Sequence, residues 1–300
     1  MKSIQMVDLY NQYSKIQQEI ENGIFSVIET SSFVKGGKVV DFQKDLEKYL
    51  GVKHVIPVAN GTDALQIALM SLGLKAGDEV ITPTFTFIST AEVVALLGLT
   101  PVVVDVDFDT FCIDIQAVKR AITPKTKAIV PVHLFGQNAN MEAILALAKK
   151  HNLFVIEDAC QSMGSQYIFK NGEKQHSGTI GDIGCTSFFP SKNLGCYGDG
   201  GAIFTNNKAL AEKITMIANH GMKVRYHHDI IGVNSRLDSI QAAVLEAKLP
   251  YLNDYIKSRQ NAADFYTEKF ADCKKVITPV TSSFSTHSFH QYTLKLVDVD

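Results

Sequence analysis

Residues 55–72 read VIPVANGTDALQIALMSL, a short β-branched run that passes at once into a helical pattern. The run Val55–Val58 predicts a buried strand. After a turn that contains Gly61, four apolar residues recur at helical spacing: Leu65, Ala68, Leu69 and Leu72. A strand that leads directly into an amphipathic helix is the building unit of an α/β fold.

The same unit repeats along the chain as far as Phe204. The expected strands are Val55–Val58, Glu79–Thr82, Val102–Val106, Ala128–Val132, Phe154–Glu157, Cys185–Phe188 and Ala202–Thr205. The expected helices after the first are Ala91–Leu97, Ile115–Ile122 and Met141–Lys150. Strands that are apolar on both faces and alternate with helices predict a largely parallel sheet covered on both sides. Such sheets bind ligands beyond the carboxyl ends of their strands.

Two long helical patterns flank this block. Tyr10–Ile28 runs toward Gly36-Gly37, and Arg236–Phe270 contains Pro250, which can break it. Leu294–Asp300 reads as a strand, and the chain stops there, too soon to complete a second domain. We therefore expect a large α/β domain over residues 1–240. Residues 241–300 would form a linking helix and the start of a small C-terminal domain.

Composition narrows the class of protein. The chain of 300 residues is 46% hydrophobic and 20% charged, which fits a globular protein. Its net charge of −2 offers no global field for nucleic acid or an anionic membrane, so neither partner is expected. No apolar run is long enough to span a bilayer, and residues 1–20 lack a signal-peptide pattern. The 5 cysteines show no C-x-x-C spacing, so we expect neither a disulfide framework nor a zinc site, and a cytoplasmic location. The pair His227-His228 shows no metal-ligand spacing with an acid, so no metal is expected there.

The turn Asn60–Ala64 is the first candidate site. It follows a strand and opens a helix, so free amides and the positive end of the helix dipole would face an anion. Gly61 allows close approach and Thr62 adds a hydroxyl, which together suit a phosphate. The alternative is an ordinary N-cap. Neither G-x-G-x-x-G nor the P-loop motif occurs.

A second candidate is the acidic pair at the end of the strand near residue 155. Asp158 there could hold a protonated ring nitrogen or a metal, or it could simply cap the next helix. Glu157 is expected to point to solvent or to pair with a lysine.

A third candidate is Lys192, which lies among small and aromatic residues after another strand. Burial can bring a lysine pKa down from about 10.4 toward neutrality, which frees the amine for Schiff-base chemistry. The glycines between Gly195 and Gly201 let the chain fold tightly past this lysine. Most lysines are solvated surface groups, and only the surrounding pattern singles this one out.

Five segments, taken in order, are similar to the DegT/DnrJ/EryC1/StrS family of pyridoxal-phosphate-dependent nucleotide-sugar aminotransferases, from about Met6 to the end of the chain. They are NGTDAL (60–65), TFTF (84–87), EDACQS (157–162), SFFPSKNLG (187–195) and GVNSRLDSIQAA (232–243). Within that family, three segments most resemble the members that aminate UDP-2-acetamido-2-deoxy-3-oxo-glucuronate in O-antigen biosynthesis. They are Pro131–Gln137, Cys196–Gly201 and Asn234–Asp238.

The resemblance implies an aspartate-aminotransferase-like fold of type I, with pyridoxal 5'-phosphate as cofactor. Lys192 would bond covalently to the cofactor and later carry the substrate proton, and Asp158 would pair with the ring nitrogen. The remaining cofactor contacts would come from Gly61, Thr62 and Ser187 to the phosphate, Gln161 to the ring hydroxyl, and Phe87 to the ring face. Phe87 is weighed against a core aromatic, and Ser187 against a hydroxyl with only local bonds. Asn234 would reach the phosphate of a neighbouring subunit, which requires a homodimer with shared sites.

Substrate contacts rest on fewer signals. Arg225 and Arg236 could each clamp a carboxylate or a diphosphate, or form salt bridges with Asp229 and Asp238. His290 and Tyr292 fall where relatives bind the sugar. His133 is expected to be a hydrogen-bonded strand-end histidine.

The expected reaction moves an amino group from glutamate to a nucleotide-linked keto-sugar. Three alternatives stay open: an aminotransferase for a dTDP-3-oxo-6-deoxyhexose, a sugar dehydratase, and a cofactor-binding regulator without turnover. Dehydratase relatives carry histidine at the position of Lys192, which argues against that reading. Family members continue for some tens of residues beyond the point where this chain ends, so we expect the sequence to be cropped.

Overall fold

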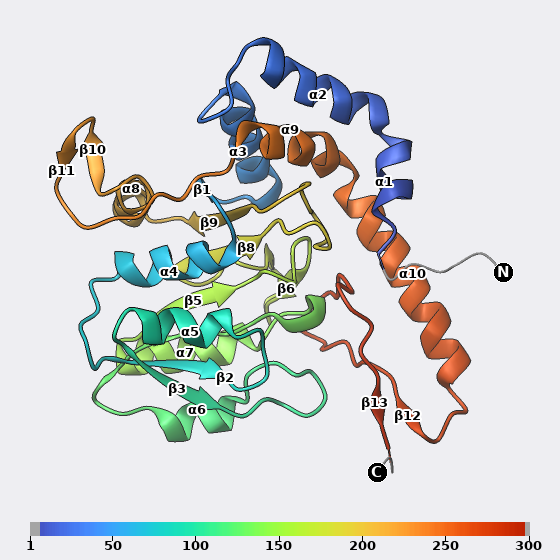
Figure 1. The fold of residues 1–300 in the computed structure, drawn as a ribbon. Coiled ribbons are helices and arrows are strands. Elements are labelled where there is room, and N and C mark those ends of the chain that lie inside the picture. Colours follow the sequence, from blue (N-terminus) through green and yellow to red (C-terminus); the bar gives the residue numbers. More distant parts are fainter. Residues whose placement is uncertain (1–6, 298–300) are drawn as a thin grey trace.

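The computed structural model describes residues 7–297, and its centre is a seven-stranded sheet (Figure 1). The strands are β1 (His54–Val58), β2 (Glu79–Pro83), β3 (Thr100–Val104), β4 (Thr126–Ile129), β5 (Phe154–Asp158), β8 (Ile183–Ser187) and β9 (Gly201–Thr205). Their order across the sheet is β1-β9-β8-β5-β4-β2-β3. All neighbours pair in parallel except β9, which is antiparallel to both β1 and β8. The predicted strands and the largely parallel sheet are confirmed.

Helices cover both faces of this sheet, as predicted. One face packs against α4 (Gly61–Ser71), α5 (Ser89–Leu96) and α8 (Lys208–Ile217). The other packs against α3 (Gly37–Leu50), α6 (Ile115–Ala121) and α7 (Met141–His151). Consecutive strand residues point to opposite faces, so Ile156 joins the first core and Val155 joins the second.

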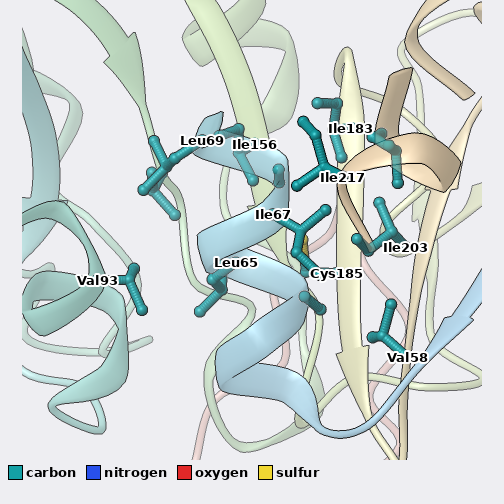
Figure 2. Close-up of a cluster of buried hydrophobic side chains, with 14 of the residues drawn as sticks. Val58, Leu65, Ile67, Leu69, Val93, Ile156, Ile183, Cys185, Ile203 and Ile217 are labelled. Carbon is teal, nitrogen blue, oxygen red and sulfur yellow. The ribbon is translucent and has the colours of Figure 1, made fainter. Parts of the chain in front are cut away.

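Figure 2 shows the first core around α4. Leu65 and Leu69 of this helix are 2% exposed, and Ile67 is fully buried. Each such side chain contributes about 1.5–3 kcal/mol through burial. The core therefore fixes α4 against the sheet, with its N-terminus at the carboxyl end of β1.

Both flanking helical patterns are interrupted. Tyr10–Ile28 forms two helices, α1 (Leu9–Lys15) and α2 (Gln17–Glu29), because the chain turns at Ile16, which is buried beside Val244. The second pattern forms α9 (Ser239–Lys248), a 3₁₀ turn (Leu249–Tyr251) and α10 (Leu252–Phe270), so the break at Pro250 is confirmed. The division at residue 240 stays a prediction. None of the helices within residues 7–297 is both long and apolar enough to cross a membrane.

Short elements complete the fold, and the sequence patterns did not indicate most of them. They are the 3₁₀ turn Leu134–Gly136 and the strands β6 (Gln166–Ile168), β7 (Lys174–His176), β10 (Met222–Val224), β11 (His227–His228), β12 (Val276–Ile277) and β13 (Lys295–Leu296). The expected strand Leu294–Asp300 is limited to β13 within the described residues, and residues 298–300 lie outside them.

Candidate active site

Three candidate segments meet at one edge of the sheet. Strands β1, β5 and β8 all run in the same direction. Strands β5 and β8 pair in parallel, and β1 and β8 are each antiparallel to β9, which lies between them. Their carboxyl ends therefore lie together and carry Asn60-Gly61, Asp158 and the segment that leads to Lys192. This is the edge where the sequence predicts ligand binding.

The N-terminus of α4 has free amides. The Asn60 side chain accepts a hydrogen bond from the amide of Asp63 at 2.8 Å, so it is an N-cap. Within residues 7–297 the amides of Gly61 and Thr62 donate no hydrogen bond. A Cβ atom placed on Gly61 would lie 2.8 Å from the Cβ of Ser187. The N-terminus of α4 thus keeps two amides that are free to donate. At residue 61 the backbone comes so close to Ser187 that only glycine fits there.

Asp158 is a buried carboxylate, 4% exposed. Its Oδ2 accepts from the Thr90 hydroxyl at 2.9 Å, and its Oδ1 accepts from the amide of Cys160 at 3.2 Å. Among the described residues no basic group lies within 4.0 Å of it. Each oxygen retains accepting capacity, and a buried carboxylate without a cation favours a positively charged partner.

Glu157 corrects one expectation. It neither points to solvent nor pairs with a lysine, because its side chain is fully buried against His133, with Oε2 2.8 Å from Nε2. The carboxylate also accepts from the amides of Gly178, Ile180 and Gly181. The His133 Nδ1 accepts from a backbone amide, which agrees with the expected strand-end histidine. This network fixes the end of β5 beside Asp158.

Lys192 is half-buried in the segment between β8 and β9. Its amide donates to the carbonyl of Phe189 at 2.8 Å. Burial raises the pKa of the Cys160 thiol, Asp158 raises it further, and the charge of Lys192 opposes this shift. Lys192 and Asp158 thus both act on the pKa of one thiol, that of Cys160.

The other predicted cofactor residues differ in exposure. Phe87 is 68% exposed, so the alternative of a core aromatic is wrong. Gln161 accepts from the amide of Phe135 at 2.7 Å through Oε1, which leaves its NH₂ group to donate elsewhere. The Ser187 hydroxyl accepts a local hydrogen bond from the amide of Phe189 at 3.2 Å.

A pocket of about 710 Å³ opens beside Lys192. Its polar and aromatic lining includes Gln12, Lys192, Arg259, Tyr266, His290 and Tyr292. The volume is within the range of small-molecule sites. The structure thus brings His290 and Tyr292 to Lys192. Burial, together with the charges of Lys192 and Arg259, lowers the pKa of His290 to about 3, so the imidazole is neutral at neutral pH.

The remaining candidates lie elsewhere in this chain. Arg225 stands in the turn between β10 and β11, 5.0 Å from the centre of the Tyr226 ring. Arg236 lines a separate pocket of about 430 Å³ beside β1. Neither arginine forms the salt bridge considered for it among residues 7–297. Asn234 is exposed.

Sequence reasoning missed three residues near the site: Thr90, Arg259 and Lys248, whose Nζ donates to the carbonyl of Gly195 in the segment after Lys192. Thr90 had no distinguishing signal, since hydroxyls are common in the first turn of a helix. Arg259 did have one, because it shares the buried face of α10 with Ile256 and Ala263. No cluster of three or more histidine, cysteine or acidic residues suited to a metal occurs in residues 7–297.

These residues fit a phosphorylated pyridine cofactor. The free amides at Gly61 suit its phosphate, and the unpaired Asp158 suits a cationic ring nitrogen. The Gln161 NH₂ suits a ring oxygen, and the exposed Phe87 can cover a ring face. Fold and site together define a fold-type-I enzyme of the aminotransferase kind.

The chain belongs to the DegT/DnrJ/EryC1/StrS aminotransferase family, whose sequence model matches residues 14–299. It is 47% identical over 293 residues to the UDP-2-acetamido-2-deoxy-3-oxo-D-glucuronate aminotransferase of Pseudomonas aeruginosa, covering 98% of this chain and 80% of the relative. It is 45% identical over 294 residues to a UDP-N-acetyl-3-dehydro-α-D-glucosamine 3-aminotransferase of Acidithiobacillus ferrooxidans, covering 98% and 78%.

A solved structure agrees with this assignment. NtdA from Bacillus subtilis, with bound cofactor PMP, superposes with a TM-score of 0.89 at 34% identity, and covers 99% of this chain and 67% of that chain. The predicted family and fold class are confirmed.

Proposed function

We propose that this protein uses pyridoxal 5'-phosphate to move an amino group from glutamate to UDP-2-acetamido-2-deoxy-3-oxo-glucuronate. The product would be the 3-amino sugar that cells build into surface polysaccharides such as the O-antigen of lipopolysaccharide. The proposal depends on one observation above others. Lys192 after β8, the buried Asp158 that has no basic partner within residues 7–297, and the free amides at Gly61 share one edge of the sheet.

The relatives support the substrate class. Both of those compared above are named for the 3-amination of a UDP-linked 2-acetamido sugar. PMP, present in the related NtdA structure, is the amine form of pyridoxal phosphate. The two sugars named differ in one group, since a glucuronate carries a carboxylate where a glucosamine carries a hydroxymethyl.

The chemistry divides between cofactor and protein. When bound, the cofactor supplies an aromatic ring that accepts electron density from the substrate carbon. Asp158 keeps the proton on the ring nitrogen, and the N-terminus of α4 holds the phosphate. The Lys192 amine takes a proton from the donor carbon and returns one to the acceptor. A single lysine serves both half-reactions because they are the same proton transfer in opposite directions.

Covalent trapping and product analysis test the proposal. Protein purified with pyridoxal phosphate should absorb in the near-ultraviolet to visible range, and borohydride should fix the cofactor to Lys192. Incubation with glutamate and a panel of UDP- and dTDP-keto-sugars should yield an amino sugar. The variant Lys192→Ala should lose both results, whereas Lys223→Ala, an exposed lysine on β10, should keep them.

Each alternative has its own outcome. If only a dTDP-3-oxo-6-deoxyhexose is aminated, that sugar is the substrate. Loss of a sugar hydroxyl without nitrogen transfer would indicate a dehydratase. A colourless protein with no adduct at Lys192 would favour a regulator and refute the proposal.

We also propose that the enzyme is a homodimer in which Asn234, Arg225 and Arg236 serve the partner's site. None of the three lines the Lys192 pocket of its own chain, and Asn234 and Arg225 are exposed. Mixing Lys192→Ala with Asn234→Ala chains tests this, since a hybrid dimer would keep one intact site and regain activity. Activity no greater than the sum of the separate variants would contradict shared sites.

A cytoplasmic location stays a prediction. It is supported by the cysteines, all five of which are free thiols.

A further inference from the structure

The Lys192 pocket contains an arginine, Arg259, to which the sequence analysis assigned no role. Arg259 lies on α10, which runs beside α1 and the segment after residue 284 (Figure 1). It occupies the same helix face as Ile256 and Ala263, which are buried. Burial lowers the pKa of its guanidinium, but the ordinary pKa of arginine is so high that the group stays charged at neutral pH. A charged side chain on an apolar helix face costs stability, so a partner is expected.

The contacts of Arg259 orient it without neutralising it. Its Nη1 donates to the carbonyls of Phe289 at 3.2 Å and His290 at 3.3 Å. No carboxylate in residues 7–297 lies within 4.0 Å of the guanidinium. One edge of the planar group is thus anchored to main chain, and its remaining N–H groups are free for a ligand.

The rest of the pocket is short of negative charge. Its acid, Asp8, is exposed and accepts from the amide of Asn11 as the cap of α1. His290 is neutral at neutral pH, and its Nδ1 is buried without a hydrogen-bond partner. Lys192, the proposed attachment point of the cofactor, lines the same pocket. Within residues 7–297 the pocket therefore offers the Arg259 cation and one unsatisfied polar atom to an acidic ligand.

We propose that Arg259 forms a carboxylate-binding subsite in the pocket of Lys192. A guanidinium presents two parallel N–H donors that match a carboxylate, which a lysine does not. The inference deepens the proposed function, because glutamate and a 3-oxo-glucuronate both carry carboxylates. It assigns Arg259 a role in specificity: the subsite would distinguish a uronate from the neutral sugar named for the Acidithiobacillus relative.

Binding of matched ligands to the holoenzyme tests this subsite. UDP-glucuronate and UDP-glucose differ only in the carboxylate, and glutarate represents the donor acid. Calorimetry would compare the wild type with Arg259→Gln, Arg259→Lys and the control Arg120→Gln, an exposed arginine on α6. We expect Arg259→Gln to weaken a carboxylate ligand by about 10- to 150-fold and UDP-glucose by less than about threefold. Arg259→Lys should recover part of the loss, and Arg120→Gln should change nothing.

The three ligands identify the source of the carboxylate. Loss for UDP-glucuronate alone indicates the sugar acid, loss for glutarate alone indicates the donor, and loss for both indicates a shared subsite. Equal loss for UDP-glucose, or no loss for either acid, overturns the proposal. If Arg259→Gln does not fold, Arg259→Lys replaces it in the same comparison of ligands, because lysine keeps the positive charge and lacks the two parallel N–H donors of the guanidinium. Borohydride trapping at Lys192 in the same samples reports separately on the proposed function.

Discussion

Replacing Lys248 by methionine would test how the fold holds the lysine-bearing segment. Lys248 is 1% exposed on α9, and its Nζ donates to the carbonyl of Gly195 at 2.8 Å. The same Nζ lies 4.3 Å from the centre of the Tyr197 ring. Burial lowers the pKa of Lys248 from 10.5 to about 8. The side chain thus ties the segment after Lys192 to α9 at the cost of desolvating an amine.

The sign of the pH effect follows from these two pKa values. Between pH 8 and 10.5 the unfolded chain keeps a proton on Lys248 that the folded chain has lost, so wild-type stability rises with pH there. At about 1.4 kcal/mol for each pH unit, the gain from about pH 8 to about pH 9.5 is about 2 kcal/mol. Methionine removes this gain. At pH 7 the substitution removes the free-energy cost of burying the amine. This gain in stability offsets the loss of the hydrogen bond and of the cation–π contact, each worth about 1–2 kcal/mol.

Urea unfolding at pH 7 and pH 9.5 measures the difference. We expect the two proteins to be within about 1 kcal/mol at pH 7, and the wild type to gain about 2 kcal/mol over Lys248→Met at pH 9.5. Cys196, whose pKa is raised to about 11 chiefly by burial, stays protonated at both pH values. Lys223→Met, which loses only an exposed ion pair of 3.6 Å, is the control and should follow the wild type. Parallel pH dependence of the wild type and Lys248→Met would refute the reasoning.

Three further substitutions give separate tests. Gly61→Ala places a Cβ 2.8 Å from that of Ser187 and should lower the free energy of unfolding in urea by about 1–3 kcal/mol. It should also weaken cofactor binding at least about tenfold. Unchanged binding in a fluorescence titration would contradict the phosphate role. Glu157→Leu strips the acceptor from His133 and should lower the unfolding free energy by about 3–5 kcal/mol, so a loss below about 1 kcal/mol would count against the network. Phe87→Ala, at a side chain 68% exposed, should change stability by less than about 0.5 kcal/mol yet weaken the cofactor, and the reverse pattern would identify a core residue.

Local patterns in the sequence were sufficient to predict the strands of the central sheet. Each strand was a short apolar run beside a helix, and alternate residues of a run such as Val155-Ile156 enter different cores. The same reasoning missed α3 and α8, which are amphipathic and whose apolar residues are separated by charged ones. The bend at Ile16 was also missed, because it depends on Val244, far along the chain.

The candidate site shows the same limit. Lys192, Asp158 and Gly61 were predicted from short motifs at strand ends, and the structure brings these ends to one edge because β5 and β8 are parallel. The surroundings of Glu157 were mispredicted, since its partners come from two distant segments. Arg259 was missed although its spacing from Ile256 and Ala263 places it on their helix face, because its contacts come from the distant segment at Phe289 and His290.

The reversed direction of β9 constrains any redesign of this enzyme. Ser187 at the end of β8 pairs with Gly201 at the start of β9, so the thirteen-residue excursion that carries Lys192 leaves and re-enters the sheet at neighbouring positions. Because the pairing of Ser187 with Gly201 fixes both ends, an inserted or deleted residue would change the path of the segment and displace the amine. Directed evolution aimed at new sugars should therefore vary α1, α10 and the C-terminal segment, and preserve the length of this excursion.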